Sequence, residues 1–289
     1  MSAPVTPAPA AAPRSLRAAF RGRPTLSIGC ALLALIALAG IFAPWLTAWD
    51  PTAISPTTRA QPPSSEHWFG TDMLGRDVFA RALYGARISL IVGFGVAAVS
   101  TAVGVLLGLL AGFVRWLDPV IMRVMDALMA IPTILIAIAL IAVSSASVGM
   151  VIVAIALAEM PRLVRLVRAS VLTLREQPYV EVAVATGASP ARVIWRHLLP
   201  NATAPIIVQI TYQIGVAILM EAGLSFLGVG IPPIIPSWGN MMSEGRALWL
   251  VKPYLVLFPA LWLTVTILAV NMIGDGLRDL LDPRMKERS

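Results

Sequence analysis

The chain has 289 residues, of which 58% are hydrophobic, and its mean hydropathy is +0.82, whereas soluble domains contain about 45–50% apolar residues. This composition excludes an ordinary soluble domain and indicates a polytopic, all-α membrane protein surrounded by lipid. The net charge of +7 does not indicate a nucleic-acid-binding protein, because the basic residues are distributed by segment and are not gathered on one solvated face.

The first 25 residues are expected to form a cytoplasmic tail. They are rich in Ala and Pro, and up to residue 23 they carry no acidic residue but four basic ones, Arg14, Arg17, Arg21 and Arg23. Residues 26–45 are an apolar segment of about twenty residues, which is enough to cross a bilayer. Because a cleaved signal peptide has a shorter apolar region, we expect this segment to remain as the first transmembrane helix.

Residues 46–87 are predicted to be an external loop that contains one interfacial helix. Four prolines between Asp50 and Ser65 favour extended backbone over helix. From Arg76 onward the apolar residues fall on one helical face, which is typical of a helix lying at the membrane surface; they are Phe79, Ala82, Leu83, Ala86 and Leu90.

Five further apolar segments complete a transmembrane domain predicted at residues 88–275. The fourth span of the chain is short, and it reaches a sufficient length only if it extends through Leu166 with Arg162 and Arg165 directed to the interface. The predicted spans after the first are Ile88–Val114, Val120–Val143, Val148–Leu166, Ala204–Leu227 and Leu250–Ile273. Residues 276–289 are then a cytoplasmic tail.

The distribution of Lys and Arg predicts the orientation. The N-terminal tail has four, the turn from Arg115 to Arg123 has two, and the segment from Arg162 to Arg196 has six, whereas the other short connections have one. By the positive-inside rule, both ends of a six-span chain are cytoplasmic. The first external loop is also basic, but it is long and its acidic residues balance the charge.

A helix–turn–helix is predicted within the cytoplasmic segment 175–201. Helix-forming residues run from Tyr179 to Thr186, and Gly187 supplies a left-handed helix end. Ser189 is a good N-cap and Pro190 a good first residue for a second helix. That helix is expected to stop at Pro200.

These twenty residues resemble the EAA loop of ABC importer permeases. Glu181, Ala183, Gly187, Leu199 and Pro200 fall on the pattern, while Val182 and His197 depart from its commonest form. The sequence His-Leu-Leu-Pro-Asn from His197 is similar to the version found in dipeptide and oligopeptide permeases. The resemblance implies that the loop contacts ATPase subunits, through residues expected to be Glu181, Ala183, Gly187, Ser189, Arg192, His197, Leu199 and Pro200.

The similarity extends from about Leu26 to Arg284, in four segments in the same order. The chain resembles the C-type transmembrane subunit of the peptide-family ABC importers, which implies the type I permease fold, a bacterial inner-membrane location and transport by alternating access. It also implies four partners: a homologous B-type permease, two ATP-binding subunits and an external solute-binding protein.

Residue types for catalysis, metal binding or ATP binding are sparse. Cys30 is the single cysteine and His67 and His197 are far apart, so we expect no disulfide and no metal site. Neither Lys252 nor Lys286 follows a phosphate-binding glycine loop. We therefore expect that the chain is not an enzyme and has no cofactor of its own, and that ATP and Mg²⁺ bind to the partner ATPase subunits.

Glu221 is the charged residue that falls in the middle of a predicted span. A carboxylate there is costly unless it faces a cavity, is paired or is protonated. Two roles are open: Glu221 lines the translocation path, or it makes a structural hydrogen bond to the partner permease. The following residues, Ala222 to Pro233, resemble the corresponding stretch of peptide permeases.

Two alternatives concern the function. An ion-coupled secondary transporter would show several intramembrane charges and paired broken repeats, and the sequence has neither feature. Within the same family, nickel, glutathione or another small solute could replace the peptide, because the choice of substrate is expected to lie mainly with the binding protein.

Overall fold

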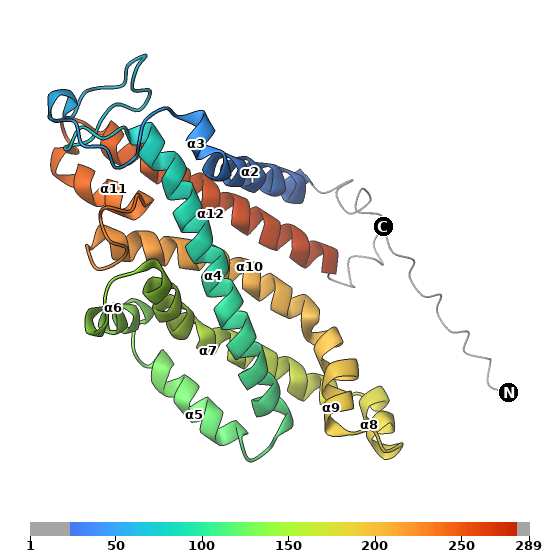
Figure 1. The fold of residues 1–289 in the computed structure, drawn as a ribbon. Helices are drawn as coiled ribbons and strands as arrows, with labels where there is room; N and C mark the ends of the chain where they lie inside the picture. The colour runs from blue at the N-terminus through green and yellow to red at the C-terminus, as the bar shows by residue number, and fades with distance from the viewer. Residues whose placement is uncertain (1–23, 282–289) are drawn as a thin grey trace.

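The computed structural model describes residues 24–281, and these are largely helical (Figure 1). The helices are α2 (Pro24–Ile41), α3 (Ala43–Leu46), η1 (Pro56–Thr58), α4 (Val78–Phe113), α5 (Asp118–Met129), α6 (Thr133–Val143), α7 (Val148–Arg175), α8 (Pro178–Ala185), α9 (Pro190–Val193), the π turn η2 (Ile194–Leu198), α10 (Leu199–Phe226), α11 (Trp238–Gly245), η3 (Arg246–Leu248) and α12 (Tyr254–Leu281). The predicted tail 1–25 lies almost entirely outside the described residues. The described part of the predicted tail 276–289 continues α12.

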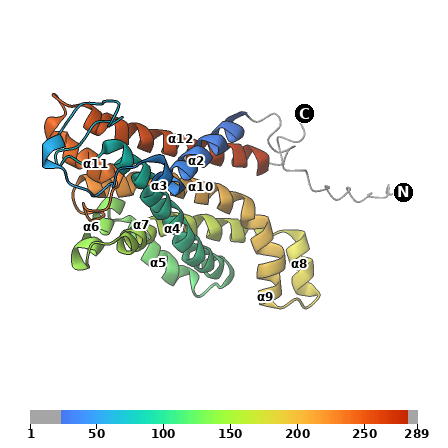
Figure 2. The ribbon, with the colours of Figure 1, turned by 45° about the horizontal axis from the view of Figure 1, so that its top comes forward.

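The long helices run between two ends of an elongated molecule (Figures 1 and 2). One end carries the loop of residues 47–77 together with α11, and the other end carries α8 and α9. Of the long helices, α4, α7 and α10 run between these two ends (Figure 1).

Four described helical segments are long and apolar enough to cross a bilayer, and the bent pair α5–α6 would make a fifth. The four are Pro24–Ile41, Val78–Phe113, Pro190–Phe226 and Tyr254–Leu281. With 28 residues, α7 is also long enough, but Glu159, Arg162 and Arg165 interrupt its apolar part. The predicted fourth span therefore depends on the length and course of α7, and Pro161 lies inside this helix without ending it.

The third predicted span, Val120–Val143, is not a single helix. Instead, α5 and α6 meet at an angle of 89° across a three-residue break. Pro132 precedes α6 with extended backbone (ψ 131°), and a residue that precedes proline is disfavoured in helical geometry. Proline and its neighbour therefore break the span near its middle.

The interfacial helix predicted from Arg76 does not exist as a separate element. These residues form the first turns of α4, which continues unbroken for 36 residues. Asp77 caps this helix, since its side chain accepts a hydrogen bond from the Ala80 N–H at 2.6 Å. Val78 and Leu83 are buried, so the N-terminal part of α4 is held by packing and does not lie on a membrane surface.

The helices α4 and α7 pack against each other and approach closely along a row of glycines on α4. A Cβ atom added to Gly108 would lie 2.6 Å from Cβ of Val167, a distance that real Cβ contacts do not show. Three glycines spaced by four residues, Gly104, Gly108 and Gly112, face Leu163, Val167 and Val171 in turn. Small residues at this spacing let two backbones touch within a membrane, so α4 and α7 form one rigid pair.

The sequence did not lead us to expect α11. This helix lies in the connection between α10 and α12 and begins with Ser237, whose side chain accepts a hydrogen bond from the Asn240 N–H. The buried Trp238 indole donates to the Ala82 carbonyl of α4 at 3.0 Å. Because Trp238 joins the core formed by α4, α10 and α12, α11 is fixed to the ends of these helices.

Candidate functional site

The predicted helix–turn–helix is present at the end of the molecule opposite residues 47–77. Gly187 has φ +84° and follows α8. Its N–H donates to the Val184 carbonyl, and the Ala188 N–H donates to the Ala183 carbonyl, both at 3.0 Å. This is the paired hydrogen-bond pattern of a Schellman helix end. The glycine turn predicted from the sequence is confirmed.

The second helix also begins as predicted but does not end as predicted. Ser189 accepts a hydrogen bond from the Arg192 N–H at 3.4 Å and caps α9. Pro200 was expected to stop the helix, yet the chain continues into α10. A π turn lies directly before Pro200, and in it the Leu199 N–H donates to the Ile194 carbonyl.

The π turn explains why Pro200 is tolerated. In a regular α-helix the proline ring collides with a carbonyl of the preceding turn and removes one hydrogen bond, whereas a π turn is wider and carries a different hydrogen-bond register. The side chain of Asn201 supplies a further bond, because its Nδ2 donates to the His197 carbonyl at 2.6 Å. The segment from Pro190 to Phe226 is therefore continuously helical, with a bend between α9 and α10 (Figure 2).

A compact apolar cluster fixes this loop to the long helices. Val180, Val193 and Leu198 have exposed fractions of 3%, 1% and 0%. Their buried neighbours in the cluster are Leu109, Leu163, Val167, Val171, Ala202 and Ile206. The loop is thus anchored to α4, α7 and α10, and a force on α8 or α9 acts directly on those helices.

The outer surface of the loop exposes both apolar and charged side chains. Large apolar side chains are exposed by 42–67%, namely Tyr179, Val182, Val184 and Trp195. Glu181, Arg192 and Arg196 are exposed beside them. Several large apolar side chains exposed in one short segment are typical of a protein-binding surface.

The residues predicted to contact the ATPase subunits divide by exposure. Glu181, Gly187, Ser189, Arg192 and Pro200 are exposed, while Ala183, His197 and Leu199 are half-buried. Among the described residues, Glu181 has no side-chain hydrogen bond or ion pair, so its carboxylate is free to bind a partner. The His197 ring lies 6.2 Å from the Tyr179 ring and holds α8 beside the π turn.

Ion pairs join α5 to α7 next to this loop. Arg168 makes a two-bond contact to Asp118, with distances of 2.5 and 2.6 Å, and Arg165 pairs with Asp126 at 2.6 Å. Because these arginines are three residues apart, they lie on one face of α7. They hold α5 against the cytoplasmic half of α7 that the sequence predicts.

Glu221 is fully buried and has hydrogen-bond partners inside this chain. Ser225 donates to one carboxylate oxygen at 2.9 Å, and Ser89 of α4 donates to the other at 3.3 Å. The side chain of Ser237 is a third hydrogen-bonding neighbour. The sequence alone did not indicate these partners. No surface of Glu221 is open to a path here, and the carboxylate joins α4, α10 and the start of α11.

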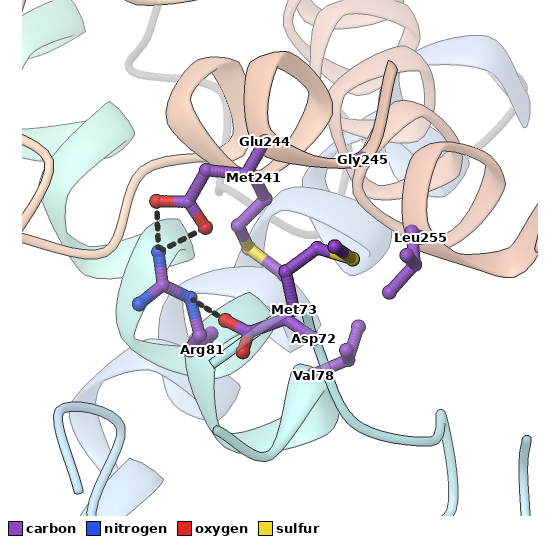
Figure 3. A pocket seen from close by; sticks show the side chains of 8 residues that line it. All are labelled: Asp72, Met73, Val78, Arg81, Met241, Glu244, Gly245 and Leu255. Carbon is purple, nitrogen blue, oxygen red and sulfur yellow. Dashed lines mark hydrogen bonds and ion pairs between the residues drawn. The ribbon is translucent and has the colours of Figure 1, made fainter. Parts of the chain in front are cut away.

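At the opposite end, the loop of residues 47–77 is fastened to α11 by buried charges. Figure 3 shows the Arg81 guanidinium between the carboxylates of Asp72 and Glu244, with nitrogen–oxygen distances of 3.7 and 3.4 Å. Arg76 contacts the same two acids at 2.6 and 2.5 Å. Burial raises the pKa of Glu244, while Arg81 and Arg76 lower it and Asp72 raises it.

The space enclosed by this cluster measures about 10 Å³, which is no more than one water molecule needs. The cluster therefore cannot bind a solute and serves to hold the loop. Its pairs lie far apart in the sequence, since Arg81 and Glu244 are separated by 163 residues, and no local signal identifies them. Within residues 24–281, no three His, Cys, Asp or Glu side chains lie close enough together to bind a metal ion.

Comparison with known proteins gives concordant matches. Residues 104–287 match the family described as binding-protein-dependent transport system inner membrane component, and residues 14–63 match the N-terminal TM domain of oligopeptide transport permease C. The chain is 51% identical, over 92% of its length and 91% of the relative, to a probable peptide ABC transporter permease protein of Sinorhizobium fredii. It is 46% identical, over 90% and 86%, to the dipeptide transport system permease protein DppC of Alkalihalophilus pseudofirmus.

Among solved structures, the fold resembles a chain of the methionine ABC transporter MetNI in inward-facing conformations. The TM-score is 0.58 with 18% sequence identity, and the match covers 70% of this chain and 96% of the other. At that identity the similarity concerns the fold alone.

Proposed function

The chain belongs to the family of binding-protein-dependent transport system inner membrane components, and from this membership we propose that it forms one half of the translocation path of a peptide importer. It is a multi-pass permease of the bacterial inner membrane with the type I ABC importer fold. It is a transport component and not itself an enzyme. The peptide substrate is supported by the names of its relatives in Sinorhizobium fredii and Alkalihalophilus pseudofirmus.

The partners that we propose are a homologous B-type permease, two ATP-binding subunits and an external solute-binding protein. ATP and Mg²⁺ would bind to the ATP-binding subunits, because this sequence contains no glycine loop followed by lysine. The observation that supports an ATPase partner is the surface of α8 and α9, where exposed apolar side chains rest on a fully buried anchor.

The anchor suggests how movement passes through the chain. When an ATPase subunit displaces α8 or α9, the buried cluster that contains Val180, Val193 and Leu198 would pass the force to α4, α7 and α10. Because α4 and α7 are locked by their glycine contacts, the three helices would turn as one rigid body. Rigid-body turning of two permease halves gives alternating access.

The test compares two exposed tryptophans in the complete four-subunit complex. Trp195 is 67% exposed on the proposed docking surface, and Trp116 is 72% exposed in the turn between α4 and α5. Because tryptophans often dominate binding surfaces, Trp195→Ala should lower the amount of ATPase subunits that copurify and lower ATP-driven peptide uptake into proteoliposomes. Trp116→Ala should leave both unchanged. Equal behaviour of the two variants would contradict the docking surface.

Uptake assays also decide between substrates. Radiolabelled dialanine, glutathione and Ni²⁺ are supplied in turn with the binding protein, with and without ATP. The proposal expects ATP-dependent uptake of dialanine. Uptake of glutathione or Ni²⁺ alone would keep the transport mechanism and change the substrate, whereas uptake driven by an ion gradient without ATP would replace the mechanism.

A further inference from the structure

A hollow of about 400 Å³ opens between α10 and α12. This volume lies within the range of small-molecule binding sites, about 300–1,000 Å³. Six polar or charged residues of these two helices are among those that line it, namely Gln209, Thr211, Tyr212, Asn271, Asp275 and Arg278. It differs in this respect from the sealed cluster around Arg81, which has no room for a solute.

Most polar side chains of this hollow have no hydrogen-bond partner among the described residues. Thr211 donates to the Val208 carbonyl of its own helix at 2.8 Å. The side chains of Gln209, Tyr212 and Asn271 make no hydrogen bond with any described residue. Polar groups within a span are costly unless they find partners or water, and their presence marks a functional site by default.

The hollow lies in the half of the molecule that also carries α8 and α9. Two of its lining residues are in close contact, because a Cβ atom on Gly274 would lie 2.9 Å from the Thr211 hydroxyl oxygen. On the orientation predicted from the sequence, this half of the molecule is the cytoplasmic one.

Two residues of opposite charge on α12 line the hollow. Asp275 and Arg278 are both exposed, and neither forms an ion pair with the other or with any described residue. They are three residues apart on α12, so their Cβ atoms are about 5–6 Å apart. An extended chain spans about 3.3–3.6 Å per residue, so the two charged ends of a dipeptide are close enough together to reach two side chains on neighbouring positions of one helix face.

We propose that this hollow binds the transported peptide on its way to the cytoplasm, with Asp275 contacting the ammonium group and Arg278 the carboxylate. Gln209, Tyr212 and Asn271 then offer hydrogen bonds to the peptide backbone. The site rests on the proposed function as a peptide importer and adds to it the residues that contact the substrate.

The first experiment labels the hollow directly. A benzophenone amino acid is placed at Tyr212, which is 51% exposed in the hollow, or at Leu106 of α4, which is 56% exposed outside it. The purified four-subunit complex is irradiated with radiolabelled dialanine and without the binding protein, so that any selectivity belongs to the permease. We expect label at position 212, removed by excess unlabelled dialanine, and none at position 106.

The second experiment tests the two charges by competition at position 212. Asp275→Asn should weaken competition by dialanine roughly three- to tenfold and should leave competition by N-acetyl-dialanine unchanged. Arg278→Gln should have the same effect for dialanine and none for dialanine amide. The matched control is Asp279→Asn, an exposed residue one turn further along α12, which should behave like the wild-type chain.

The outcomes separate the site from the function. If wild-type proteoliposomes take up dialanine but position 212 is never labelled, the site is wrong and the function stands. If position 212 instead crosslinks to the partner permease with or without peptide, the hollow is a subunit interface and the proposal is overturned. If dialanine is neither transported nor bound, the peptide function itself fails.

Discussion

Gly187 is the residue whose conformation can be tested most simply. Its φ is +84°, and a Cβ atom there would meet no atom within 4 Å. A substitution therefore costs backbone strain of roughly 1–2 kcal/mol and causes no collision. Gly187→Val should insert and pair with the partner permease normally, while ATPase binding falls or ATP is hydrolysed without uptake, as measured in proteoliposomes.

Gly187→Asn is the matched control, because asparagine adopts left-handed backbone more readily than other residues. It should retain most of the transport that Gly187→Val loses. If both variants transport at the wild-type rate, the direction of α9 does not matter for coupling. In that case the role proposed for the loop is wrong.

Glu221 should affect stability more than substrate contact. Glu221→Gln keeps the shape and one oxygen acceptor, so the purified complex should melt close to the wild-type temperature. Glu221→Leu leaves Ser89 and Ser225 without their acceptor, at about 1–3 kcal/mol for each orphaned group, and should lower the melting temperature. Transport lost in Glu221→Gln without any change in melting would favour a role in the path instead.

The sequence predicts residue conformations where the signal is local. Gly187, Ser189 and Pro190 are neighbours, and each has an intrinsic preference that its neighbours do not oppose. The partners of Glu221 could not be predicted in the same way, because Ser89 lies 132 residues away. The sequence around Ser89 also does not indicate that this serine hydrogen-bonds to an acidic residue.

At the scale of helices, the contact between α5 and α7 can be tested by exchanging charges. Arg168→Asp places two carboxylates together and should lower the melting temperature of the complex. Adding Asp118→Arg should restore most of the loss, with a coupling energy of about 1 kcal/mol, since both groups are partly exposed. Arg123 of α5 is exposed and forms no ion pair with any described residue, so Arg123→Asp is the control and should have little effect.

If the double variant is no more stable than Arg168→Asp alone, the ion pair does not hold α5. The remaining contacts are apolar and include Met125, Met160 and Val164. They would then be sufficient to place α5 beside α7.

Long helices were predictable from composition, but their interruptions were not. The apolar segment from Val120 to Val143 was predicted as one helix, but it breaks at Pro132. A proline inside a helical pattern does indicate a possible break. The opposite error occurred at Pro200, where a π turn carries the helix past a residue expected to end it. Both outcomes depend on tertiary packing, which decides whether a helix bends at a proline, breaks there or continues past it.

At the scale of the molecule, the orientation stays a prediction that labelling can test. With Cys30 replaced by alanine, single cysteines are introduced at Ser64 and Ile234 and, at the other end, at Thr186 and Ser189; all four residues are exposed. A membrane-impermeant maleimide applied to whole cells should label the first two only. Labelling of Ser189 from outside would invert the topology and remove the ATPase-coupling role.

The choice of sites itself depends on the structure. Ser237 falls in the same external connection as Ile234, but its side chain is completely buried, so a cysteine there would not react on either side. The six crossings stay a prediction, since length and composition of the described helices support four or five. Basic residues on α7 lower its mean hydropathy. Arg165 and Arg168 pair with acidic residues of α5, and a hydropathy average takes no account of such pairing.

The π turn has a consequence for how insertions and deletions in this segment should be understood. The buried positions Val193, Leu198, Ala202 and Ile206 are spaced by five, four and four residues. A regular helix advances about 100° per residue, so the five-residue step is the one that the wide turn absorbs. Loss of one residue between Ile194 and Leu198 would leave a good α-helix, yet it would rotate the docking surface by about 100° relative to α10. The π turn between α9 and α10 should therefore tolerate exchanges of side chains but not changes in length.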